Sequence, residues 1–123
     1  MKVLALDYGS ARTGVAVSDP SGTVARPTGV VERAATDRGF AQLLALIAAE
    51  GPERIVVGLP LTLRGDHGEQ ARETERFVER LRGAIEIPVE TYDERFTSVL
   101  AGGDDARAAA HLLSSYLEWQ TRS

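Results

Sequence analysis

Acidic side chains follow two apolar segments of this 123-residue chain and begin its last amphipathic segment. Asp7 comes directly after the first apolar run, and Asp93 and Glu94 come directly after the last one. Asp105 has the spacing of the apolar residues that follow it, so on a helix it lies in the first turn and faces inward. Ligands of α/β sheets collect beyond the carboxyl ends of the parallel strands. We therefore expect Asp7, one of Asp93 and Glu94, and Asp105 to converge at one edge of a sheet.

Converging carboxylates repel one another unless cations bind between them. Their oxygen atoms are ligands that suit Mg²⁺ or Mn²⁺, and this chemistry needs neither cysteine nor histidine. Two such ions about 3.5–4 Å apart activate a water molecule and stabilise the leaving oxygen of a phosphodiester. The three positions therefore predict a two-metal site for Mg²⁺ or Mn²⁺ that hydrolyses phosphodiester bonds.

Each carboxylate also has an ordinary structural explanation. Asp93 and Glu94 fit a solvated charge cluster, and Asp104 or Asp105 fits a helix cap, where aspartate is favoured. Asp7 fits the start of a turn. However, a carboxylate directly after a buried strand is costly unless it is paired or bound to a metal ion. Asp7 is therefore the position at which the structural explanation is weakest.

Glycines and arginines near these carboxylates are candidates for substrate contact. Gly9 and Gly58 could let the backbone approach a phosphate, although ordinary turns explain them equally well. Arg64, Arg72 and Arg76 could lie near the mouth of the site and meet a nucleic-acid backbone. The alternating charges of the segment that carries Arg72 and Arg76 more simply indicate a solvated helix face.

The periodicity of the apolar residues predicts the elements that position these groups. Patterns typical of strands cover 3–6, 14–18, 23–31, 54–58 and 87–92, and helical spacing covers 36–50, 69–83 and 105–119. Two tight connections make the first three strands an antiparallel meander, and Pro27 places the third strand nearer an edge. The later strands follow β-α-β connections. The expected fold is one α/β domain, residues 1–123, with a mixed five-stranded sheet and helices on its faces.

The composition excludes several other classes of protein. A chain of this length buries one core and not two, which argues against an enzyme with two closing lobes. It has no cysteine, which excludes disulfides, thiolate nucleophiles and cysteine-based zinc sites. The net charge of −4, from 14 basic and 18 acidic residues, is not the positive charge typical of nucleic-acid-binding proteins. Binding to a nucleic acid therefore needs a local basic patch. No apolar run approaches the roughly 20 residues of a membrane span, and we expect a cytoplasmic protein without membrane contact.

Four segments in order resemble the motifs of the YqgF family, the Holliday-junction-resolvase-like pre-16S rRNA nucleases. They are Leu-Ala-Leu-Asp-Tyr-Gly with Gly-Val-Ala-Val-Ser-Asp at 4–19, Ile-Val-Val-Gly-Leu-Pro-Leu at 55–61, Asp-Glu-Arg-Phe-Thr at 93–97, and 105–117. The resemblance implies a ribonuclease H-like fold and a bacterial cytoplasmic protein that matures the 5′ end of 16S rRNA. It assigns the catalytic and metal-binding roles to Asp7, Glu94 and Asp105, and so selects Glu94 over Asp93 and Asp105 over Asp104, a choice that spacing alone cannot make.

The same motifs supply the candidate substrate contacts, and they also differ from the family pattern. We expect substrate-binding roles for the following residues: Gly9, Arg12, Gly58, Arg95 and Thr97. Ala11 and Thr62 stand where family members often have lysine and asparagine. Only ten residues, 95–104, separate the last two motifs, where family members usually carry a longer, basic insert. Ten residues can still close the gap between the carboxylates, but a basic arm for the substrate is missing.

These observations favour a metal-dependent nuclease that acts on RNA, with pre-16S rRNA as the expected substrate. A catalytically silent RNA-binding or ribosome-assembly module is the alternative that the acidic charge and the short 95–104 segment suggest. A DNA-junction resolvase is a further alternative, and it requires a symmetric dimer, so both monomer and homodimer remain open. Nucleotide binding of the actin-like type needs a second lobe, which this chain is too short to supply.

Overall fold

Five strands form one mixed sheet in the computed structural model, which describes residues 1–60, 64–65, 67–93 and 105–122. The strand order is β3-β2-β1-β4-β5, with β1 parallel to β4, β4 parallel to β5, and the pairs β1–β2 and β2–β3 antiparallel. The strands are β1 (Val3–Asp7), β2 (Arg12–Ser18), β3 (Ala25–Glu32), β4 (Arg54–Leu59) and β5 (Val89–Asp93). The predicted meander and the predicted parallel strands are both confirmed.

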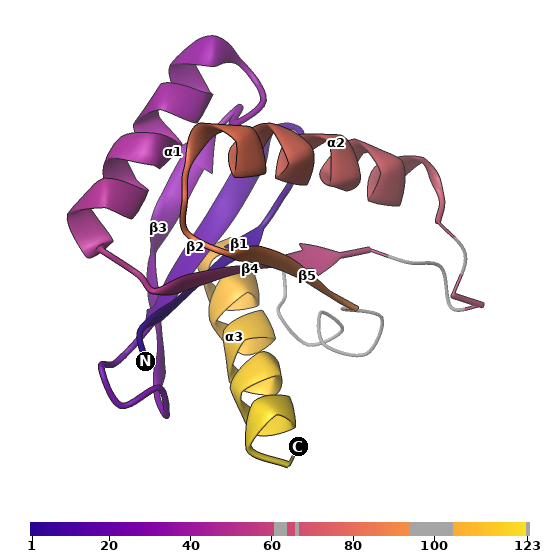
Figure 1. Ribbon diagram of the computed structural model, residues 1–123. Coiled ribbons are helices and arrows are strands. Elements are labelled where there is room, and N and C mark those ends of the chain that lie inside the picture. The colour runs from indigo at the N-terminus through magenta and orange to yellow at the C-terminus, as the bar shows by residue number, and fades with distance from the viewer. Residues whose placement is uncertain (61–63, 66, 94–104, 123) are drawn as a thin grey trace.

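Three helices cover the two faces of this sheet. Figure 1 shows α1 (Asp37–Glu50) and α2 (Glu69–Ala84) on one face and α3 (Asp105–Arg122) on the other. Leu4 and Leu6 of β1 pack with α1 and α2, whereas Val3 and Ala5 pack with α3. Alternate side chains of β1 therefore enter two separate apolar layers, and both faces of this strand are covered. Within the described residues no helix is long and apolar enough to cross a membrane.

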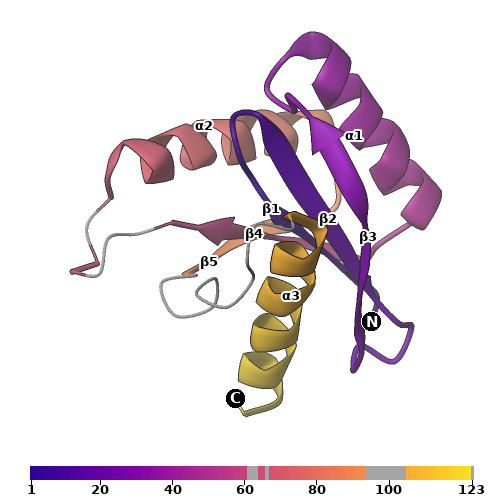
Figure 2. The same ribbon diagram turned by 180° about the vertical axis from the view of Figure 1, so that it is seen from behind.

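Local sequence signals explain most element boundaries. Thr36 caps α1 by accepting a hydrogen bond from the Gly39 N–H at 3.1 Å, and Gly51 ends that helix in the left-handed conformation, with φ 60°. Pro27 lies in β3 next to a register shift, at the edge of the sheet seen in Figure 2. The last strand begins at Val89, later than predicted, because Pro88 has no N–H to donate to the ladder.

The turn between β3 and α1 packs so closely that it requires a glycine. Arg33 has a positive φ of 47°, and its carbonyl oxygen accepts hydrogen bonds from the Thr36 N–H and hydroxyl. A Cβ atom at Gly39 would collide with this same carbonyl oxygen. Helix α1 can therefore meet the end of β3 only with glycine at this position.

We predict opposite effects for the same substitution at two helical glycines. Gly39→Ala should lower the free energy of unfolding by about 1–3 kcal/mol, because backbone must move to admit the methyl group. Gly83→Ala in α2 should raise it by about 0.5–1 kcal/mol, because nothing lies within 4 Å of the added Cβ atom and alanine favours the helix. Urea denaturation of both variants measures the difference. Equal effects of the two substitutions would contradict the close approach.

A polar network on the other face ties α3 to the beginnings of β4 and β5. The Tyr116 hydroxyl accepts hydrogen bonds from Arg54 Nη1 and Gln120 Nε2, each at 3.0 Å, and donates one to Glu90. Burial, followed by the hydrogen bond with Glu90, raises the pKa of Tyr116 above its usual value of 10.0. The phenol is therefore held in its neutral form.

This shift predicts a loss of stability at alkaline pH. Because the pKa is raised in the folded state, the stabilisation is complete below about pH 10 and decreases as pH rises toward the folded pKa. Tyr116→Phe should lower the free energy of unfolding by about 1 kcal/mol at neutral pH. Above pH 10 the difference in free energy of unfolding between the wild type and Tyr116→Phe should become smaller. Denaturation across pH 7–11 tests this, and a difference that stays constant would contradict the assigned cause.

Candidate functional site

The carboxyl ends of β1, β4 and β5 lie level with one another at one edge of the sheet. The register pairs Leu6 with Val57, and Gly58 with Tyr92. Asp7, the last residue of β1, is therefore level with Gly58 and Tyr92. Two strand spacings separate it from β5, roughly 10 Å. This is the edge at which the sequence predicts that the carboxylates converge.

The side chains at this edge divide between the two faces of the sheet. Val3 and Ala5 belong to the α3 layer, so alternation places half-buried Asp7 on the α3 face as well. Tyr8 instead packs against the layer formed with α1 and α2. On β5, Tyr92 packs against the α3 layer, which places Asp93 on the opposite face. Asp7 and Asp93 therefore share an edge of the sheet but face different helices.

A cavity of about 200 Å³ opens beside Asp7. Its walls come from the β1–β2 turn, from the residue after β4 and from the first turns of α2. They consist of Asp7, Tyr8, Gly9, Ser10, Pro60, Gln70, Glu73 and Thr74. Asp7 and Gly9, both predicted site residues, thus border one cavity together with Glu73 of α2. This cavity lies on the α2 side of the sheet edge, whereas alternation directs the Asp7 side chain toward the α3 side.

Glu73 is a cavity residue that the sequence pattern does not reveal. Its helix buries the residues at 71, 74, 77, 78 and 81, and Glu73 lies beside that stripe, at a position that charge alternation assigns to solvent. The one available signal is its position four residues before the buried Phe77, which places the two side chains on the same side of α2. In the folded chain Glu73 and Tyr8 line the same cavity.

The Tyr8 ring forms a fixed wall between the cavity and the core. It stacks on Phe77 with 4.4 Å between ring centroids and an interplanar angle of 25°, and Phe77 in turn meets Phe40 edge-on at 6.2 Å. Burial raises the pKa of the Tyr8 phenol, and the charge of Glu73 raises it further, while Arg76 acts in the opposite direction. The phenol is therefore neutral at physiological pH.

The β1–β2 turn explains why glycine occupies position 9. A Cβ atom there would collide with the Arg12 carbonyl oxygen. The Gly9 N–H donates to Thr13 Oγ1 at 3.4 Å, and the buried Thr13 side chain is thereby drawn against the turn. Gly9 thus has a structural role in addition to the substrate contact predicted for it.

The remaining predicted residues lie at the same edge or outside the described part of the chain. Gly58 is buried in β4, and Arg12 is exposed at the start of β2, where it pairs with Glu32. Neither residue lines the Asp7 cavity. Glu94, Arg95 and Thr97 lie outside the described residues. Asp105 begins α3, on the face that Asp7 occupies, and its side chain is also outside the described part. Among the described residues no group of three or more His, Cys, Asp or Glu could hold a metal ion.

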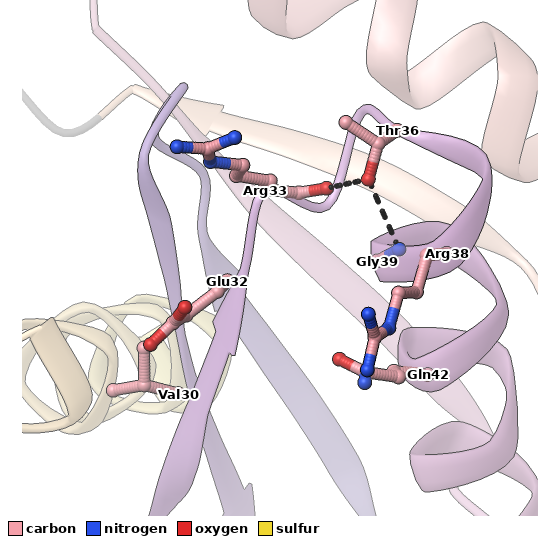
Figure 3. Close-up of a pocket in the computed structure, with 7 residues that line it drawn as sticks. All are labelled: Val30, Glu32, Arg33, Thr36, Arg38, Gly39 and Gln42. Atoms are coloured by element: carbon pink, nitrogen blue, oxygen red, sulfur yellow. Dashed lines mark hydrogen bonds between the residues drawn. The ribbon is translucent and has the colours of Figure 1, made fainter.

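A larger cavity, of about 630 Å³, lies between β3 and α1 and does not include Asp7 (Figure 3). It contains none of the predicted site residues. Arg38 and Gln42 of α1 point toward one another there, and Thr36 is engaged in capping. The lining consists of Val30, Glu32, Arg33, Thr36, Arg38, Gly39 and Gln42. The larger cavity is therefore not the one that contains predicted site residues, and the Asp7 cavity is the candidate site.

One family model and several known proteins are similar to this chain. Residues 1–104 match the family model described as "RuvX: Holliday junction resolvase". A protein of Chloroflexus aggregans named "Putative pre-16S rRNA nuclease" is 46% identical over 99 residues, which are 80% of this chain and 70% of that protein. A Chloroflexus aurantiacus protein of the same name is also 46% identical over 99 residues, and there this chain matches 65% of the relative's length.

A third relative is similar over nearly its whole length. The Oleidesulfovibrio alaskensis protein, with the same name, is 36% identical over 132 residues, covering 95% of this chain and 92% of its own. That alignment is longer than the 123 residues of this chain, so the relative carries residues that this chain lacks.

Solved structures confirm the ribonuclease H-like α/β fold. A structure titled "T. thermophilus RuvC in complex with Holliday junction substrate" has a TM-score of 0.66 at 17% identity, covering 98% of this chain and 96% of that chain. A second, titled "Thermus thermophilus RuvC structure", has a TM-score of 0.64 at 16% identity and covers 99% and 97%. The resemblance to the YqgF family noted in the sequence is confirmed by the family match, and the chain belongs to this family, whose model is described as RuvX, Holliday junction resolvase.

Proposed function

We propose that this protein is a metal-dependent nuclease that hydrolyses phosphodiester bonds of RNA, and that it acts on the 5′ end of pre-16S rRNA. The observation that carries the proposal is the position of Asp7. It ends the central strand of the sheet and lines a cavity large enough for a phosphate group. The names of the relatives support RNA as the substrate class.

The donor set fits Mg²⁺ or Mn²⁺. The proposed ligands are the carboxylates of Asp7, Glu94 and Asp105, all hard oxygen donors, in a chain without cysteine. Described neighbours support the choice of these three. Asp105 begins the helix that packs on the face occupied by Asp7. Asp93 faces away from that side, which favours Glu94 as the acidic residue from the third motif.

The protein groups at this edge then have separate roles. When bound, the two ions supply an activated water and neutralise charge on the leaving oxygen. Asp7 holds its carboxylate at the end of a strand that is covered on both faces, so the group is positioned before substrate arrives. Gly9 keeps the turn close enough for a phosphate to approach the backbone. Arg12, Arg95 and Thr97 are proposed to contact flanking phosphates, and Gly58 keeps the end of β4 free of a side chain.

A DNA-junction resolvase is the second candidate, and the family description and the likeness to RuvC favour it. Because a four-way junction presents symmetric strands, that function would require a homodimer. For the RNA nuclease a monomer is sufficient. Both versions place a single domain, residues 1–123, in the cytoplasm, where pre-rRNA and chromosomal DNA are found in bacteria.

We predict that Asp7→Asn removes Mn²⁺-dependent cleavage of a 16S rRNA leader extended at its 5′ end. The rate should fall roughly 100-fold or more, since metal-assisted stabilisation of the transition state amounts to several kcal/mol. Asp93→Asn is the matched control, because it changes an acidic residue at the same edge but on the other face, and it should retain activity. Addition of a chelator should abolish cleavage by the wild type.

The same assay separates the alternatives. A synthetic four-way DNA junction in a parallel reaction should be cut poorly, and preferential cleavage of the junction would replace the RNA proposal with the resolvase. Cleavage that survives Asp7→Asn or the chelator would overturn the metal mechanism. RNA binding without any turnover would identify a catalytically silent module.

A further inference from the structure

A second cavity, of about 190 Å³, adjoins the Asp7 cavity along α2. The two cavities share Tyr8 and Glu73, so they meet at this pair of side chains. The second cavity is lined by Tyr8, Ala35, Glu73, Arg76, Phe77 and Arg80. It therefore continues the path away from Asp7 toward the loop that precedes α1.

Aromatic groups form the apolar part of this second cavity. Tyr8 and Phe77 stack on one another at 4.4 Å, and the contact of Phe77 with Phe40 anchors both rings. A rigid aromatic wall of this kind packs well against the flat base or the sugar of a nucleotide, and it does not depend on which base is present.

Two arginines border the same cavity, and their surroundings differ. Arg80 is fixed by hydrogen bonds to the Ala35 carbonyl oxygen at 2.7 Å and to Asp37 at 2.9 Å, and its guanidinium lies 4.0 Å from the centre of the Phe40 ring. These contacts already satisfy much of its hydrogen-bonding capacity. Arg80 thus stabilises the wall of the cavity more than it offers a binding group.

Arg76 is held much more loosely than Arg80. Its ion pair with Glu69 spans 3.9 Å, and the side chains are 67% and 81% exposed. Such an exposed pair contributes little to stability, so Arg76 can turn toward another anion at small cost. The planar guanidinium group binds phosphate oxygens in a bidentate manner.

Glu73 restricts where a phosphate can bind along this path. Its carboxylate borders both cavities and repels a phosphate placed between them. Beyond Glu73, one helical turn further along α2, Arg76 supplies the opposite charge. A nucleic-acid strand with one phosphate at Asp7 would therefore place its next phosphate contact at Arg76.

We propose that the second cavity is a subsite for the nucleotide next to the cleaved phosphodiester in a single strand, with Arg76 as its phosphate contact and Tyr8 as its packing surface. This inference rests on the proposed function, since it assumes that the cleaved phosphate is held at the end of β1, beside the opening of the Asp7 cavity. Of the three arginines that the sequence places near the site mouth, the structure selects Arg76. Arg72 is exposed on the same helix and lines neither cavity.

The test compares Arg76→Ala with Arg72→Ala, each combined with Asp7→Asn so that binding is measured without cleavage. Fluorescence anisotropy with a short single-stranded oligoribonucleotide gives Kd at several salt concentrations. Arg76→Ala should weaken binding roughly tenfold at low salt, because a charge-assisted contact is lost. It should also reduce the slope of log K against log salt by about 0.7, the contribution of one phosphate contact in a single strand. Arg76→Lys should keep most of the slope, and Arg72→Ala should leave both quantities unchanged.

Two further measurements separate a loss of RNA binding from a loss of folding or of catalysis. Thermal unfolding followed by circular dichroism should give similar Tm values for all variants, because both arginines are exposed. With Asp7 intact, Arg76→Ala should raise KM and leave kcat nearly unchanged. If Arg72→Ala and Arg76→Ala weaken RNA binding equally, general electrostatic attraction replaces the proposed subsite. RNA binding that does not change in Arg76→Ala would also overturn the subsite. If the wild type fails to cleave RNA but its binding still depends on Arg76, the proposed function fails, and Arg76 remains a phosphate contact of a binding site without cleavage.

Discussion

Burial of β1 on both faces is the constraint on which the arrangement of this protein depends. The strand pairs with β2 on one side and β4 on the other, and the two apolar layers take alternate side chains from it. Val3, Leu4, Ala5 and Leu6 are almost completely inaccessible to solvent. No polar group can be tolerated within such a strand without a partner. The first position at which the chain can present a carboxylate is therefore the end of the strand, and Asp7 occupies it.

The alternation of side chains that buries β1 also directs the two residues at its end to opposite faces of the sheet. Asp7 faces α3, on the side proposed to supply the other carboxylates, and Tyr8 faces α2. A shift of one residue in the register of β1 would exchange these roles and would place a carboxylate against Phe77. The rigid pairing on both sides of β1 prevents that shift. Two adjacent residues thereby link the proposed metal site with the groove along α2.

The sequence alone predicts the features that depend on local chemistry. The apolar run before Asp7 and the edge position of the strand that contains Pro27 are predicted in this way, and the structure confirms them. The cap at Thr36 and the left-handed Gly51 follow from short-range preferences of the same kind. Choices that depend on packing across the sheet cannot be made in this way. The placement of Asp93 on the face opposite Asp7 depends on the side from which Tyr92 meets α3. The role of Glu73 depends on Tyr8, a residue 65 positions away in the chain that helical periodicity cannot bring beside it.

The charge distribution bears on how an acidic protein would bind a nucleic acid at the proposed site. The chain carries a net charge of −4, so long-range attraction does not assist the approach of a polyanion. Binding must then arise from a few short-range contacts, and the salt dependence of the affinity must be correspondingly small. Helix α2 meets this requirement by alternating its charges, with Glu73 at the junction of the cavities and Arg76 one turn beyond it. Repulsion at Glu73 and attraction at Arg76 would fix the register of a phosphate backbone more sharply than a uniformly basic surface does. A strand shifted by less than one nucleotide would place a phosphate against the Glu73 carboxylate.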